Sequence, residues 1–196
     1  MNNYKNNARF AGVMFLTAMV ASLVGGTMIA TDEKIMVVFG IILELINALA
    51  VIGIIAALWN PLKKEYPSMT VGYLGVRIIE VIFCIAAAFI PVVVLNLGNN
   101  ASQFMVLLNT TRDVIVAFAV PCFFGIGGLL FYIMLYRSRL VPRYISVWGF
   151  AATIGIILVM FVSVTAIKPI LGLPIIINEI YLGIYLIVKG FKDEIK

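Results

Sequence analysis

Six long apolar segments divide this chain, and each is long enough to cross a lipid bilayer as a helix. About 20 helical residues span the hydrocarbon core of a membrane. The predicted helices cover residues 8–30, 35–58, 70–97, 113–136, 144–166 and 171–189. Inside lipid every backbone polar group must find a partner within the protein, and a helix provides one. The sequence therefore predicts an all-α fold, a polytopic integral membrane protein whose six transmembrane helices form a single membrane domain over residues 1–196.

The composition excludes an ordinary soluble domain. The chain is 63% hydrophobic and 12% charged, whereas globular domains are about 45–50% apolar and about 25% charged. Lys and Arg outnumber Asp and Glu by 14 to 9, but they lie in short connections between the apolar segments. That distribution is typical of membrane topology. We therefore expect contacts with membrane lipids and none with nucleic acid.

Basic residues are distributed unevenly between the two sides of the predicted bundle. One side, formed by the termini and by the second and fourth connections, contains ten of them: Lys5, Arg9, Lys63, Lys64, Arg137, Arg139, Arg143, Lys189, Lys192 and Lys196. The other side contains three: Lys34, Arg112 and Lys168. Connections rich in Lys and Arg stay in the cytoplasm. Both termini are therefore predicted to be cytoplasmic.

Residue types that commonly serve metals and cofactors are scarce. The chain contains no histidine, and its two cysteines, Cys84 and Cys122, lie far apart within apolar segments. Histidine is the commonest metal ligand and general base, and cysteine pairs at short spacing are the usual sign of a zinc site. We therefore expect no metal site and no cofactor, and we assign no catalytic residue.

Four charged residues lie inside the predicted helices, where their placement costs free energy. They are Glu44, Arg77, Glu80 and Glu179. A charge at the centre of a membrane helix costs about 2.5–3.5 kcal/mol on insertion scales, so such residues face the interior of a bundle or a water-filled cavity. With a rise of about 1.5 Å per residue, all four fall in the middle third of the bilayer.

Further polar residues follow the same helix faces as these charges. One face of the third predicted helix has residues at spacings of four, three and four: Tyr73, Arg77, Glu80 and Cys84. The second and sixth predicted helices each add an asparagine close to a glutamate. The simplest packing turns these faces toward one another. The candidate ligand- or ion-binding residues are therefore Glu44, Asn47, Tyr73, Arg77, Glu80, Asn178 and Glu179.

Four parts of the sequence also carry a family pattern. They are the opening residues 8–13, Arg77 in its helix, the stretch 136–143, and Glu179 with residues 186–190. With these residues the chain resembles the domain-of-unknown-function 4386 family of small bacterial and archaeal membrane proteins. The resemblance covers nearly the whole chain. It implies a one-domain, multi-span protein in the cell membrane of a prokaryote, and it implies no active site.

The charge balance of the four intramembrane residues favours a binding or transport function. One arginine against three glutamates leaves two negative charges without a partner if all are ionised. Such a site can take up a proton, a cation or a small amphipathic molecule with a basic group. Pro91 and Pro121 lie within predicted helices and should kink them. Six helices are few for a transporter acting alone, so this interpretation predicts a homo-oligomer.

Other interpretations stay open. The polar residues can hold helices together without binding any ligand, since polar contacts between membrane helices are common. Paired carboxylates can also act as acid and base in an intramembrane lipid-modifying enzyme. A membrane partner or sensor protein without small-molecule chemistry is a further alternative. In that case the basic 137–143 connection would contact anionic lipid or another protein.

Overall fold

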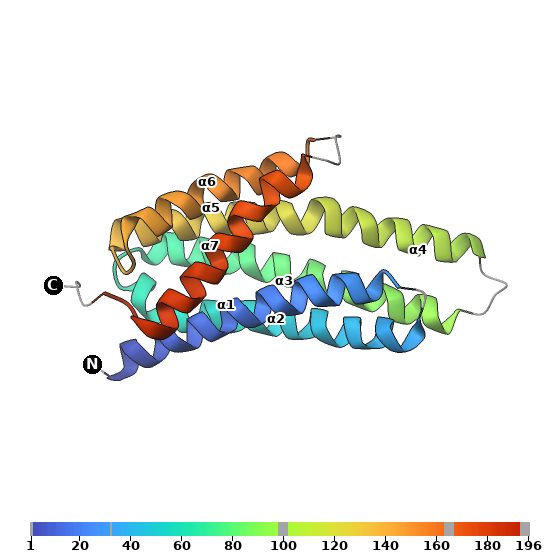
Figure 1. The fold of residues 1–196 in the computed structure, drawn as a ribbon, viewed down its shortest axis with the longest axis horizontal. Coiled ribbons are helices and arrows are strands. Elements are labelled where there is room, and N and C mark those ends of the chain that lie inside the picture. Colours follow the sequence, from blue (N-terminus) through green and yellow to red (C-terminus); the bar gives the residue numbers. More distant parts are fainter. Residues whose placement is uncertain (1, 32, 98–101, 163–166, 193–196) are drawn as a thin grey trace.

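The described part of the chain forms seven α-helices and one short π-helix. The computed structural model describes residues 2–31, 33–97, 102–162 and 167–192, and these contain no β-strand. The elements are α1 (Asn2–Ile29), α2 (Lys34–Lys63), α3 (Pro67–Asn96), α4 (Ser102–Val114), the π-helix η2 (Ile115–Ala119), α5 (Val120–Ser138), α6 (Arg143–Val159) and α7 (Lys168–Val188). The elements α4, η2 and α5 follow one another without a break and form one long helical stretch (Figure 1).

The helices form a closed ring. Helix α1 packs against α2 and α7, α3 packs against α2 and α5, and α6 packs against α5 and α7. The order around the ring is therefore α1, α2, α3, α5, α6 and α7, with α4 extending beyond it (Figure 1). The start of α1 and the end of α7 lie at the same end of the bundle, which we call the N/C end. The ends of α1, α3 and α6 lie toward the opposite end, as do the starts of α2, α4 and α7.

Within the described residues, five helical stretches are long and apolar enough to cross a membrane. They are Tyr4–Ile29, Lys34–Lys63, Pro67–Asn96, Gln103–Ser138 and Lys168–Val188. Helix α6 is apolar but has 17 residues, fewer than the roughly 20 that a full crossing takes. The predicted all-α fold is confirmed for the described residues, with five helices able to span a membrane by length and composition. The sixth span stays a prediction.

Four predicted helix boundaries were wrong. Helix α1 begins at Asn2 rather than at residue 8, and α2 ends at Lys63 rather than at residue 58. The fourth helix was expected to begin at residue 113 after an external connection, but the chain is helical from Ser102 onward. The sequence indicated at most a short interfacial helix over residues 103–109 of this polar stretch. In the structure Thr110 and Thr111 donate their hydroxyls to the carbonyls of Val106 and Leu107, each at 2.8 Å. The fifth helix was expected to reach residue 166, but α6 ends at Val159, and residues 163–166 lie outside the described part of the chain.

Glycines allow neighbouring helices of the ring to approach closely. Where α1 crosses α7, a Cβ added to Gly12 would lie 2.5 Å from the carbonyl oxygen of Gly183. Where α1 crosses α2, a Cβ added to Gly40 would lie 2.8 Å from the carbonyl oxygen of Gly25. Small residues at membrane helix crossings let backbones touch. These crossings fix α1 between its two neighbours and so set the width of the ring.

Candidate functional site

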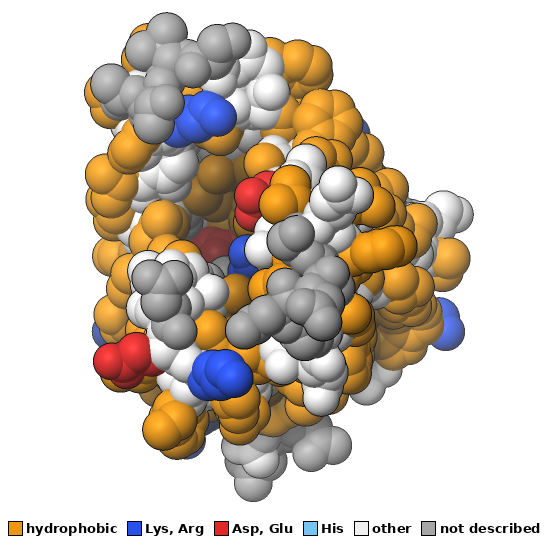
Figure 2. All heavy atoms as spheres, turned by 90° about the vertical axis from the view of Figure 1, so that its right-hand side faces the viewer, with side chains coloured by type: hydrophobic (Ala, Val, Ile, Leu, Met, Phe, Trp, Pro, Cys, Tyr) orange, Lys and Arg blue, Asp and Glu red, His pale blue; other side chains and the backbone are white. Residues whose placement is uncertain are grey.

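A cavity lies at the centre of the ring, and all six helices of the ring line it. Its volume is about 250 Å³. Viewed from the opposite end, the molecule is hollowed, and acidic and basic side chains are visible inside the hollow (Figure 2). The apolar lining includes Phe15 of α1, Phe124 of α5 and Ile156 of α6. The lining also contains polar side chains and one thiol: Ser22, Asn47, Arg77, Glu80, Cys84 and Glu179.

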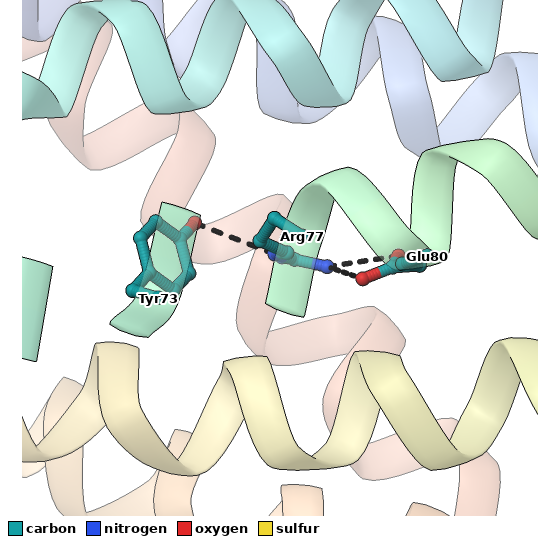
Figure 3. A network of polar contacts seen from close by, with 3 residues as sticks. All are labelled: Tyr73, Arg77 and Glu80. Atoms are coloured by element: carbon teal, nitrogen blue, oxygen red, sulfur yellow. Dashed lines mark hydrogen bonds and ion pairs between the residues drawn. The ribbon is translucent and has the colours of Figure 1, made fainter. Parts of the chain in front are cut away.

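A buried ion pair on α3 forms one wall of this cavity. Nη1 of Arg77 donates to both carboxylate oxygens of Glu80, at 2.9 and 2.6 Å (Figure 3). The two side chains are 3% and 4% exposed, so water screens the pair little. Their i, i+3 spacing places both on the same helix face, as the sequence predicted. The pair contributes no net charge to the cavity.

Aromatic rings and a glycine hold the Arg77 side chain in place. Nε of Arg77 donates to the hydroxyl of Tyr73 at 3.4 Å (Figure 3). The guanidinium carbon lies 5.6 Å from the ring centroid of Tyr73 and 5.1 Å from that of Phe124. A Cβ on Gly127 of α5 would lie 3.2 Å from Cδ of Arg77, so the glycine leaves room for the side chain. Nη2 of Arg77 has no hydrogen-bond partner among the described residues.

Glu179 of α7 also lines the cavity, but its carboxylate has no partner among the residues that the structure describes. In the described part of the chain it forms neither a hydrogen bond nor an ion pair. It lies within electrostatic range of both Arg77 and Glu80. Because the Arg77–Glu80 pair is neutral, an ionised Glu179 gives the cavity one net negative charge. Among the residues that the structure describes, no three histidine, cysteine, aspartate or glutamate side chains are grouped to hold a metal ion.

The structure divides the predicted site residues into three groups. Asn47, Arg77, Glu80 and Glu179 line the cavity together. Tyr73 does not line it and instead supports Arg77 from the N/C side. Glu44 and Asn178 do not line it either. The carboxylate of Glu44 faces α1, where a Cβ on Gly26 would lie 3.8 Å from its Oε1.

Asn178 serves the packing of three helices. Its Oδ1 accepts a hydrogen bond from the hydroxyl of Tyr132 at 2.7 Å, and its Nδ2 donates to the carbonyl of Ile145 at 3.1 Å. The side chain is fully buried. These bonds connect α7 to both α5 and α6. Asn178 is therefore a structural residue in this conformation, although the sequence predicted a binding role.

An aromatic cluster closes the cavity toward the N/C end. The rings of Phe15 and Tyr73 each lie 5.7 Å from the ring of Phe131, and Phe131 lies 5.1 Å from Tyr132. All four side chains are at most 2% exposed. Tyr73 precedes Arg77 on α3, which starts at the N/C end, so the cluster lies on that side of the ion pair. We call these four residues the aromatic floor.

Sequence reasoning missed several residues of the site. Phe124, which lies over the guanidinium of Arg77, looked like any other apolar residue of its helix. The wall formed by α1, including Ser22, also carried no signal in the sequence. One interruption of regular α-helix adjoins the cavity: the π-helix η2 directly precedes the lining residue Val120. Such interruptions are frequent at functional sites.

Comparison with protein families identifies the group to which the chain belongs. Residues 10–190 match the family model described as domain of unknown function (DUF4386). The match covers nearly the whole chain, so the chain is a member of this family, and the resemblance seen in the sequence is confirmed. Comparison with curated proteins and with solved structures finds no match. The family carries no assigned activity.

Proposed function

We propose that this member of the DUF4386 family binds a small organic cation with an apolar body in the central cavity. The sequence left a proton, a cation or a small amphipathic molecule open as the ligand. The proposal selects one of these, an organic cation with an apolar body. The observation that carries the proposal is the carboxylate of Glu179, which lines the central cavity and has no hydrogen-bond or ion-pair partner among the described residues. Arg77 and Glu80 satisfy each other beside it.

The charge of the cavity favours a cation. An unpaired ionised carboxylate is very costly to bury in a medium of low dielectric constant. A positively charged ligand group would remove that cost, whereas an anion would meet the repulsion of Glu179. Nη2 of Arg77 leaves its two N–H groups to donate to an oxygen or nitrogen of the ligand. These donors orient a ligand without adding a second charged requirement.

The walls and the volume favour an organic ligand over a bare ion. Phe15, Phe124 and Ile156 are among the apolar side chains that line the cavity. Aromatic faces attract cations, and more so where water is excluded. A volume of about 250 Å³ corresponds to roughly eight waters at about 30 Å³ each. That space accommodates a small amine, but it is too small for a two-chain lipid.

The shape of the cavity indicates entry from the opposite end. The hollow opens on that side (Figure 2), while the aromatic floor closes the N/C side. Passage through the protein would require the floor to move. Binding from one side therefore comes first in this proposal, and transport would be a second step that depends on displacement of Phe131 and its neighbours.

Binding can be tested with benzyltrimethylammonium, a cation with a small apolar body. Equilibrium dialysis of the purified chain in detergent would measure its binding, with phenylmethanesulfonate as an anion of similar size. We expect saturable binding of the cation and none of the anion. Binding should weaken as the pH falls, because protons compete with the cation for the Glu179 carboxylate. In Glu179→Gln both the binding and its pH dependence should be lost.

A matched control separates the cavity from general surface charge. Glu65 lies in the exposed α2–α3 connection, so Glu65→Gln removes the same charge far from the cavity. This variant should bind the cation like the wild type. Equal binding of cation and anion, or unchanged binding in Glu179→Gln, would contradict the proposal.

The geometry favours this function over a lipid-modifying enzyme. Both oxygens of Glu80 accept hydrogen bonds from Arg77, so an acid–base pair would have to rely on Glu179 and a carboxylate already occupied. For a partner or sensor role without small-molecule chemistry, the cavity itself would have no purpose. Lipid analysis after expression of wild type and Glu80→Gln would reveal an enzyme by a changed lipid species.

The proposal includes the topology predicted from the sequence. Helix α6 would complete six spans of a single domain, with the N/C end in the cytoplasm of a prokaryotic cell. A reporter that is active only in the cytoplasm, fused after Lys196, tests this orientation. The predicted homo-oligomer is not needed to form the cavity, because one chain supplies all six walls. Cross-linking in native membranes would measure the oligomeric state.

A further inference from the structure

Three basic side chains surround a second pocket, on the surface of the N/C end. They are Arg139, Arg143 and Lys192, and Val141 and Pro142 complete the lining of a pocket of about 310 Å³. The basic residues come from two segments that are distant in sequence, the α5–α6 connection and the segment after α7. The backbone N–H of Lys192 donates to the carbonyl of Leu140 at 2.9 Å and fixes one segment against the other.

The α5–α6 connection is anchored in the core and holds one arginine in a strained conformation. Leu140, Val141 and Ile145 are at most 1% exposed. Arg139 has φ 55° and ψ 20°, the left-handed region. It is the only residue other than glycine with a positive φ among those described. This conformation costs an ordinary residue about 1–2 kcal/mol, and glycine would adopt it without strain. A basic side chain at this position therefore indicates a function that glycine could not serve.

An apolar groove adjoins the basic pocket. It has a volume of about 220 Å³ and lies between the last turns of α5 and the first turns of α6, lined by residues that include Ile133, Tyr136, Val147 and Phe150. Tyr136 and Val147 are 42% and 55% exposed, so the groove opens on the outside of the helix ring. The guanidinium of Arg143 lies 5.1 Å from the ring centroid of Tyr136. This contact joins the basic pocket to the groove.

We propose that the pocket and the groove together bind one membrane lipid with an anionic phosphate headgroup. The phosphate would lie among Arg139, Arg143 and Lys192, and one acyl chain would lie along the α5–α6 groove. Arginine binds phosphate through charge-assisted hydrogen bonds of fixed geometry. The groove faces outward from a bundle of membrane-spanning helices, so the apolar molecules that can fill it are lipid chains. This site is separate from the central cavity and does not depend on the function proposed for it.

The test measures the melting temperature of the full chain in detergent with added short-chain lipids. Dioctanoyl phosphatidylglycerol should raise it, whereas dioctanoyl phosphatidylcholine and inorganic phosphate should not. The double variant Arg139→Gly with Arg143→Gln should bind phosphatidylglycerol about thirtyfold more weakly, from about fivefold for each lost charge. Without lipid, Arg139→Gly alone should melt no lower than the wild type, because glycine relieves the backbone strain. That result would show that the fold is intact.

A second double variant controls for charge. Lys63→Gln with Lys64→Gln removes two positive charges from the same end of the bundle but outside the pocket. It should respond to phosphatidylglycerol like the wild type. If both double variants lost the response to phosphatidylglycerol equally, general attraction to the charged surface would explain the binding, and the proposal would be overturned. A full effect of inorganic phosphate would overturn it in favour of a free-phosphate site. An equal effect of phosphatidylcholine would show that the headgroup is not recognised.

Discussion

Two glutamates that line the same cavity should respond in opposite directions when each is changed to glutamine. Glu80 has a partner in Arg77, at 2.6 Å, whereas Glu179 has none among the described residues. Glu80→Gln therefore leaves the arginine charge buried without its counter-ion. Glu179→Gln instead replaces an unpaired carboxylate with a neutral side chain of the same shape. We expect the first variant to melt below the wild type and the second to melt above it.

The magnitudes follow from the two environments. Removing one member of a buried ion pair costs about 3–5 kcal/mol. Burying a neutral amide costs about 1–3 kcal/mol less free energy than burying an unpaired carboxylate. For a chain of this length, 1 kcal/mol changes Tm by about 2–4 °C. Glu80→Gln should therefore lower Tm by about 6–20 °C, and Glu179→Gln should raise it by about 2–12 °C.

The assay is the fraction of monodisperse protein that remains after heating in detergent, measured by size-exclusion chromatography. Glu65→Gln, in the exposed connection between α2 and α3, is the matched control and should leave Tm unchanged. Adding benzyltrimethylammonium should raise Tm in the wild type and leave Glu179→Gln unaffected, since a ligand stabilises only the state that binds it. If Glu179→Gln melts as low as Glu80→Gln, both carboxylates are structural and the proposed site is refuted.

Three further predictions concern packing. Phe131→Ala should destabilise the protein by about 3–5 kcal/mol, because it removes the central ring of the aromatic floor; thermal melting measures this, and an unchanged Tm would refute the role of the floor. Gly12→Val should abolish the folded monomer on size exclusion, because the valine side chain would collide with the backbone at Gly183. Gly75→Ala is the control and should be tolerated, since nothing lies within 4 Å of its Cβ position. Ser146→Ala should raise Tm, because Oγ of Ser146 is buried without a hydrogen-bond partner in the described residues and such a group costs about 1–3 kcal/mol; a lower Tm would indicate an unseen partner.

Hydropathy predicted which parts of the chain are helical because lipid leaves the backbone few alternatives. It predicted helix ends poorly where a helix is longer or shorter than its apolar segment. Residues 102–112 are too polar for lipid, so the sequence indicated an external connection with at most a short interfacial helix over residues 103–109. Their backbone is nevertheless compatible with a helix that extends beyond the ring as α4. A hydropathy pattern reports contact with lipid, whereas a helix also continues wherever its own hydrogen bonds are satisfied.

The sequence could predict only those contacts of the site that lie within one helix face. The spacing of Tyr73, Arg77 and Glu80 placed them on one face of α3, and the structure shows their hydrogen bonds. Whether Glu44 or Asn178 joins them depends on the rotation of α2 and α7 about their own axes. That rotation is set by packing against neighbours in the ring. The spacing of residues within one helix contains no information about it.

The arrangement of the polar residues argues against a purely structural role as a contact between helices. Arg77 and Glu80 belong to the same helix, so their ion pair joins no two helices. Glu179 lies on α7, which packs against α1 and α6, whereas α3 packs against α2 and α5. Side chains of α3 and α7 can therefore meet only across the central cavity. Asn178 shows what a structural polar residue looks like here, since it bonds to one residue of α5 and one of α6. Glu179, one residue further along the same helix, bonds to neither, which favours a ligand as its missing partner.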